Sequence, residues 1–142
     1  MSARYVPFTH ATLLAWSGGL NYLDDTIKVA LVASTYTKSL SHTVWADIST
    51  HEIASGDGYT TGGEELTSKT LTATKASSAD IVWNPLDKQF RYAVFYKEGT
   101  GNGLTNPLLG ILDYGDTVTV NNVAFTVVVP STGIAVFTQN TV

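Results

Sequence analysis

The 142-residue chain has no cysteine, few charged residues and no basic cluster, and each of these absences excludes a class of site or partner. Without cysteine, the chain has no disulfide and no thiolate metal ligand. Eight lysines and arginines stand against twelve acidic residues, for a net charge of −4, and the basic residues are scattered. Nucleic acid is therefore not expected as a direct partner, because phosphate binding requires a concentration of Lys and Arg.

Long hydrophobic runs are also missing. No apolar segment reaches the roughly 20 residues that cross a bilayer, so a membrane partner is not expected. The stretch from Met1 to Pro7 lacks the apolar core of a secretory signal, so export by that route is not indicated. Only 14% of the residues are charged, and Thr and Ser supply much of the remaining polarity. This composition suits β-strands and surfaces that contact neighbours.

The polar residues form no visible catalytic or metal-binding motif. The three histidines, His10, His42 and His51, lack the spacing of a metal-binding pair. The adjacent carboxylates Asp24 and Asp25 would point to opposite faces of a strand, which argues against the paired acids of a glycosidase. We therefore expect no cofactor, no metal and no enzymatic activity.

The segment 26–33 is the clearest strand. Residues of a strand alternate between its two faces, and here both faces are apolar, so the strand is expected near the middle of a sheet. The two apolar sets are Ile27, Val29 and Leu31 on one face, and Ala30 and Val32 on the other.

Before this strand, the sequence predicts an extended arm at residues 1–8 and one short helix at residues 9–19. Thr9 is the expected N-cap, and Gly18 or Gly19 the expected end. The predicted apolar stripe of the helix consists of Leu13, Leu14 and Trp16.

From residue 66 onward, short apolar segments alternate with turns. Asn84–Pro85 is expected to break the chain, and Asn121–Asn122 to form a two-residue hairpin turn, because Asn tolerates positive φ. About eight strands at this spacing predict a mainly β, single-domain antiparallel sandwich or jelly-roll-like barrel over residues 1–142, with one short N-terminal helix. The later predicted strands cover residues 68–74, 79–83, 90–96, 108–112, 117–120, 123–129 and 134–137.

The connection at residues 34–63 is long and rich in turns, and a connection of this length is where contact chemistry is expected. It is predicted to contain a single helical turn at 43–48. Its aromatic residues Trp45 and Tyr59 are the best candidates for exposure at an interface, where aromatic side chains are enriched. Most of the other large aromatic residues are expected in the core: Trp16, Trp83, Tyr92, Phe95, Tyr96 and Phe137.

The segment Leu23–Val32, after a short helix, resembles the start of a widespread family of small structural proteins of tailed phages. In that family a segment of the type L-D-x-D-T-I-K-V-A-L-V precedes a Tyr/Thr-containing loop, a short W/F-x-D-I element and a Gly-rich turn. The matching pieces here are Ser34–Thr37, Trp45–Ile48 and Gly56–Tyr59. The later order is also similar, at residues 66–71, 79–83, 93–97 and 109–113.

This resemblance implies a virion component without enzymatic activity. Several phages coat their capsids with small β cement proteins, so we expect a capsid decoration (cement) protein that stabilises the head by bridging capsid subunits. The expected partners are the major capsid protein and further copies of the chain. The contacts are expected in the arm and in the 34–63 connection, with these candidate interface residues: Tyr5, Val6, Phe8, Tyr36, Trp45 and Tyr59.

Two alternatives stay open at this point. One keeps the virion but places the protein in the tail, as a fibre, baseplate or tube-associated subunit. The other is a carbohydrate-binding β module that would use Trp45, Tyr59 and Trp83 as a stacking platform.

Overall fold

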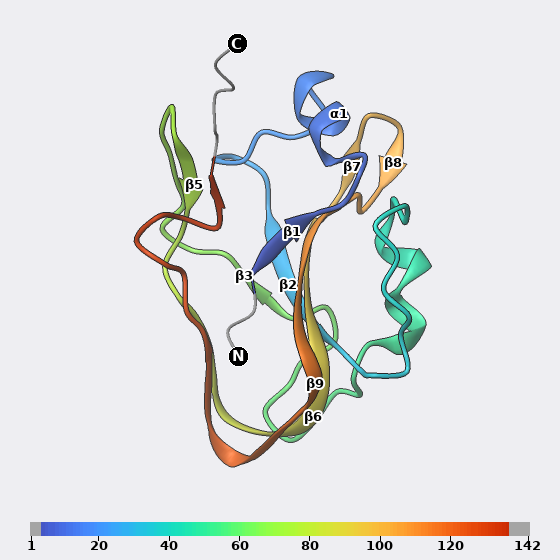
Figure 1. The fold of residues 1–142 in the computed structure, drawn as a ribbon, viewed down its shortest axis with the longest axis vertical. Helices are drawn as coiled ribbons and strands as arrows, with labels where there is room; N and C mark the ends of the chain where they lie inside the picture. Colours follow the sequence, from blue (N-terminus) through green and yellow to red (C-terminus); the bar gives the residue numbers. More distant parts are fainter. Residues whose placement is uncertain (1–3, 137–142) are drawn as a thin grey trace.

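A five-stranded antiparallel sheet in the order β1-β9-β6-β2-β3 forms the centre of the molecule (Figure 1). The computed structural model describes residues 4–136. The strands of the central sheet are β1 (Tyr5–Pro7), β9 (Leu108–Val127), β6 (Ile81–Lys97), β2 (Ile27–Val32) and β3 (Glu64–Glu65). The prediction of a mainly β, antiparallel sandwich with one short helix is confirmed.

Smaller elements surround this sheet. A three-stranded sheet in the order β10-β5-β4 lies in the second layer, and β7 and β8 form a separate two-stranded ribbon (Figure 1). Their bounds are β10 (Ala135–Val136), β5 (Lys75–Ser77), β4 (Thr70–Leu71), β7 (Thr100–Gly101) and β8 (Leu104–Thr105). The helical elements are α1 (Ala11–Trp16), η1 (Trp45–Asp47) and η2 (Ser49–His51).

Strands β6 and β9 form one long hairpin that belongs to both layers. Its proximal half, residues 92–97 with 108–112, lies in the central sheet between β2 and β1. Its distal half, residues 81–90 with 118–127, continues as a two-stranded ribbon and curves round toward the three-stranded sheet (Figure 1). The distal half thereby covers one face of the central sheet, and the first part of the 34–63 connection, with Tyr36, Trp45 and Ile48, covers the other.

Strand β2 is buried on both faces, as predicted. Ile27, Val29 and Leu31 lie in the larger hydrophobic cluster, between the central sheet and the distal half. Ala30 and Val32 lie in a second cluster, together with aromatic residues of the 34–63 connection. The two apolar faces of this segment therefore each meet a separate part of the core.

Two predicted turns lie inside the long strands instead. Asn121 pairs with Asp87 and Val123 with Leu86, so the predicted hairpin at residues 121–122 is wrong. The positive φ expected there is present, at 55° for residue 122, but it forms an irregularity within β9. Asn84–Pro85 likewise lies within β6, at a second irregularity between the pairs Trp83–Phe125 and Leu86–Val123. An extra residue in one strand bends a ladder without ending it, which lets pairing override both local turn signals.

The N-terminal arm is part of the sheet. Residues 5–7 are extended, as predicted, but they pair with residues 110–112 of β9. Phe8 is only 1% exposed and belongs to the second cluster. The predicted arm is therefore an edge strand of the folded domain, which the sequence did not indicate because a strand of three residues is too short to show a periodic pattern. Residues 1–3 of the predicted arm lie outside the described part, as does Phe137 of the predicted last strand.

Helix α1 is shorter than predicted and exposes most of its apolar residues. Its N-cap is His10, not Thr9, and no side chain caps it. Leu14 is fully buried, whereas Leu13 is 63% and Trp16 is 87% exposed. The predicted apolar stripe is therefore reduced to a single inward side chain.

Candidate functional site

An open apolar cavity of about 1100 Å³ lies between the two layers, beside helix α1. Buried side chains of the central sheet form one wall, and small and apolar residues of the second layer form the other. The sheet contributes Ile27, Phe95, Leu109 and Leu112, the second layer Leu71, Ala76, Ile134 and Ala135, and the helix Ala11, Ala15 and Trp16. The two layers of the sandwich are thus separated by the cavity beside α1 and joined at the opposite end, where the β6–β9 hairpin bends from one layer into the other.

The mouth of this cavity is apolar and almost without charge. Trp16, Leu71 and Val128 line it and are 87%, 46% and 68% exposed. Arg4 is the single charged residue among those of the described chain that line it. A concave apolar surface that continues onto exposed apolar side chains is typical of a binding site, because water is displaced from it at little cost.

Three tyrosines add hydroxyl groups to the cavity wall. The Tyr22 hydroxyl donates a hydrogen bond of 2.8 Å to the Ser77 carbonyl. Burial raises the pKa of Tyr22 and of Tyr114 to about 12. Burial, and then the neighbouring Tyr22, raise the pKa of Tyr5 still further. All three phenols are neutral at pH 7, so they offer no base or nucleophile, and Tyr22 already uses its hydroxyl hydrogen in the bond to Ser77.

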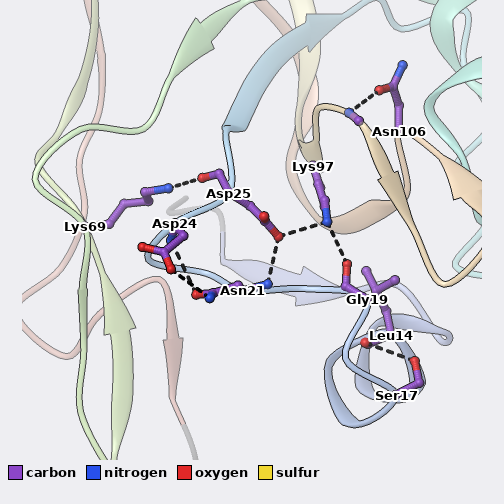
Figure 2. A network of polar contacts seen from close by, with 10 residues as sticks. Leu14, Ser17, Gly19, Asn21, Asp24, Asp25, Lys69, Lys97 and Asn106 are labelled. Carbon is purple, nitrogen blue, oxygen red and sulfur yellow. Dashed lines mark hydrogen bonds and ion pairs between the residues drawn. The ribbon is translucent and has the colours of Figure 1, made fainter.

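A polar network fixes the loop that joins α1 to β2, and with it the helical side of the cavity (Figure 2). The Lys97 ammonium on β6 donates to the Gly19 carbonyl at 3.0 Å and pairs with the Asp25 carboxylate at 3.0 Å. The same carboxylate accepts the backbone N–H of Asn21 at 2.7 Å. The Lys69 ammonium donates to the backbone carbonyl of Asp25. Both ends of the loop are therefore tied to one lysine of the central sheet.

The charges of this network set the ionisation of Asp25. Burial opposes its ionisation, but the hydrogen bonds from Asn21 and Lys97, with the positive charges of Lys97 and Lys69, outweigh it and lower the pKa of Asp25. The carboxylate is therefore ionised at neutral pH, where it contributes to stability.

Two tyrosine hydroxyls hold the 34–63 connection against the sheet, Tyr59 in the larger cluster and Tyr96 in the second. Tyr59 donates to the Glu52 carboxylate at 2.6 Å and accepts the N–H of Leu31 at 3.1 Å. Tyr96 donates to the Gly62 carbonyl at 2.7 Å. Burial, followed by the hydrogen bond to Glu52, raises the pKa of Tyr59. These contacts make the connection a fixed part of the core.

Four of the six predicted interface residues are buried. Trp45 stacks on Tyr96, with ring centroids 4.8 Å apart, so its ring covers the sheet. The predicted exposure of Trp45 and Tyr59 is wrong. Tyr5 lines the cavity, and Val6 is half-buried in β1. The exposed fractions of the four buried residues are 1% for Phe8, 3% for Tyr36, 9% for Trp45 and 2% for Tyr59.

Sequence reasoning missed the cavity and the exposed Trp16, although a local signal for Trp16 exists. Residues 14 and 16 of an α-helix lie about 200° apart around its axis, at 100° per residue. If Leu14 faces the core, Trp16 must face away. The cavity itself has no local signal, because its walls come from segments far apart in the sequence.

The three histidines have ordinary local partners. Each histidine forms a side-chain hydrogen bond: His10 with the Leu108 carbonyl, His42 with Tyr36 and His51 with Thr35. Within residues 4–136, no group of three or more His, Asp or Glu is placed to hold a metal ion. No helix in that range has the length and apolar character needed to cross a bilayer.

No family model matches the chain, and neither the curated proteins nor the solved structures contain a significant match. The resemblance to phage structural proteins therefore stays a prediction from the motifs.

Proposed function

We propose that this protein is a non-enzymatic structural component of a bacteriophage virion, a capsid decoration protein that bridges subunits at the surface of the head. The observation that carries its binding role is the open apolar cavity with its exposed apolar mouth. The motif resemblance supplies the virion context, and the cavity supplies a means of attachment.

Attachment would occur by insertion of an apolar segment of the major capsid protein between the two layers. Such a segment gains from burial against Phe95 and Leu112, while the neutral phenols of Tyr5 and Tyr114 can donate to its backbone carbonyls. Side chains that fill deep pockets carry most of the free energy of an interface. A symmetric shell repeats the contact many times, so modest affinity at each site adds up to a stabilised head.

The carbohydrate-binding alternative loses the residues on which it depends. Its stacking platform requires exposed rings, but Trp45, Tyr59 and Trp83 are 9%, 2% and 1% exposed. The tail alternative uses the same apolar contact with a different partner, and it is therefore an outcome of the test.

The test is deletion of the gene from a phage that encodes this chain. We expect heads that lose DNA at a lower temperature than wild-type heads, with tails intact. Loss of tails would replace the head assignment with the tail alternative, and absence of the protein from purified wild-type particles would overturn the virion role.

Complementation then tests the cavity. The double variant Trp16→Ser/Val128→Ser removes two exposed apolar side chains from the mouth and should restore neither particle binding nor heat resistance. Leu23→Ser is the matched control, because Leu23 is 47% exposed but does not line the cavity. If the double variant binds heads as the wild type does, the cavity is not the attachment site.

A further inference from the structure

Among residues 4–136, no strand pairs with the outer edge of β9 along its distal half. Strand β1 pairs only with residues 110–112, and β6 lies on the other side of β9. From residue 117 to residue 127, β9 therefore has a strand on one side only within the described chain. The corresponding edge of β6 is partly closed, because the Asp57 carbonyl accepts the N–H of Asp87 at 2.9 Å.

This edge lacks two of the usual protections of an exposed strand. Residues 117–127 read Thr-Val-Thr-Val-Asn-Asn-Val-Ala-Phe-Thr-Val, with no charged residue and no proline. Natural edge strands are commonly guarded by lysine, by proline or by short length, since free N–H and C=O groups recruit another strand. The irregularity at residues 121–122 divides the edge into two segments of ordinary strand length.

Exposed apolar side chains gather on the same ribbon. Val82 and Val123 are 48% and 58% exposed, and both belong to the distal half. Val128 follows directly after β9 and is 68% exposed. A strand added along this edge would shield part of this apolar surface.

We propose that the edge of β9 at residues 117–127 pairs with the same edge of a second copy, antiparallel, to form a dimer with a continuous sheet. Antiparallel strands are related by a twofold axis, so one edge is complementary to itself. The charges agree with this arrangement. Asp116, at one end of the edge, would lie beside the uncharged far end of the other copy, whereas parallel pairing would bring the two Asp116 residues together. The far end of this edge adjoins the cavity, which Thr126 and Val127 also line, but the pairing does not depend on the proposed attachment to a capsid.

The test compares two lysine substitutions in the full chain. Thr119 and Gln89 are paired across the distal half and are both exposed, but Thr119 is on the open edge and Gln89 is on β6. We expect the wild type and Gln89→Lys to show a concentration-dependent dimer in sedimentation equilibrium. Thr119→Lys should raise the dimer dissociation constant by at least about tenfold, because a charge is desolvated at the new strand pair. Circular dichroism and thermal melting of both variants serve to confirm that they are folded.

Hydrogen exchange locates the interface independently. Amides of residues 117–127 should exchange more slowly as the protein concentration rises, while amides of the 34–63 connection should not change. A wild-type chain that stays monomeric up to millimolar concentration would overturn the proposal. A dimer that Thr119→Lys leaves intact, with exchange at residues 117–127 independent of concentration, would also overturn it.

Discussion

The two halves of the β6–β9 hairpin have the same backbone pairing but different surroundings. In the proximal half, residues 92–96 and 108–112 are buried without interruption, because β1, β2, the 34–63 connection and the second layer surround them. In the distal half, Ile81 and Trp83 are buried while Val82 and Asn84 are exposed. Continuous burial is typical of a strand covered on both faces, and alternation of a strand with one face in water.

This difference suggests that the proximal half contributes mainly to the stability of the fold and the distal half mainly to contacts with other molecules. The proximal half is buried on both faces, whereas the distal half buries only alternate residues and also presents an open edge and exposed valines. A protein that needs both a stable core and a contact surface can therefore place them on the same pair of strands. The following substitutions test this division.

The largest loss of stability is expected from removing Phe8, a buried side chain that packs against the proximal half. Phe8→Ala should lower the free energy of unfolding by about 3–4 kcal/mol, because a buried ring anchors β1 beside β9 and leaves a cavity when deleted. Chemical denaturation measures it, and Phe8→Leu, which keeps most of the volume, should cost about 1 kcal/mol. A loss below about 1 kcal/mol for Phe8→Ala would mean that β1 adds little to the fold.

A matched pair of valines on β6 compares the two halves directly. Val94, in the proximal half, is fully buried, whereas Val82, in the distal half, is 48% exposed. Val94→Ala should cost about 2 kcal/mol, from lost burial and incomplete collapse of the site. Val82→Ala should change stability by less than about 0.5 kcal/mol. Equal losses in urea denaturation would contradict the division between the halves.

The hydrogen bonds of Tyr59 should contribute less. Tyr59→Phe leaves the Leu31 N–H and the Glu52 carboxylate each without one partner, and it should cost about 1–2 kcal/mol. Tyr114→Phe is the control, because Tyr114 lines the open cavity, and the thermal stability of this variant should match that of the wild type. If both variants melt together with the wild type, the connection is not held by Tyr59.

The smallest effect, and the one that depends on pH, concerns ion pairs. Asp25 pairs with Lys97 at 3.0 Å next to the proximal half, while Asp57 pairs with Lys88 at 3.9 Å on the distal half and is 72% exposed. Asp25→Asn should cost about 1 kcal/mol at pH 7. Asp57→Asn should cost less than about 0.5 kcal/mol.

The sign of the pH dependence follows from the lowered pKa of Asp25 in the folded state. The stabilisation is complete above the unfolded pKa of about 3.9 and is lost as the pH falls through the lower folded pKa. The difference in stability between wild type and Asp25→Asn should therefore shrink as the pH falls and vanish below the folded pKa of Asp25. A difference that persists there would show that the amide disturbs packing and not charge.

The sequence was informative where one segment is covered on both sides. The alternation of apolar residues in β2 predicted its place in the middle of the sheet, because both faces of that segment are apolar. Local patterns failed where pairing with a distant strand decided the outcome. Asn121–Asn122 has the chemistry of a turn, yet residues 81–90 hold it in a strand.

The site was harder to predict than the fold. Exposure of Trp45 was inferred from its position in a long connection, but stacking on Tyr96, which comes from another strand, buries it. The cavity depends on the spacing of two layers, and no short segment encodes that spacing. Of the residues at the cavity, only Trp16 could have been predicted to face outward, from the angular spacing of residues in a helix.

The pairing of β1 with β9 also has a consequence for biosynthesis. Pairing of the two strands in the proximal half closes a loop of only residues 98–107. Pairing of Tyr5 with Leu112 closes a loop that contains most of the chain. Closing a long loop costs more entropy, so we expect the hairpin to form first during refolding and β1 to dock last. Pulse-labelling hydrogen exchange should protect the amide of Val94 before that of Val6. On the ribosome, β1 emerges long before its partner, so its apolar side chains stay unsheltered until synthesis has passed β9.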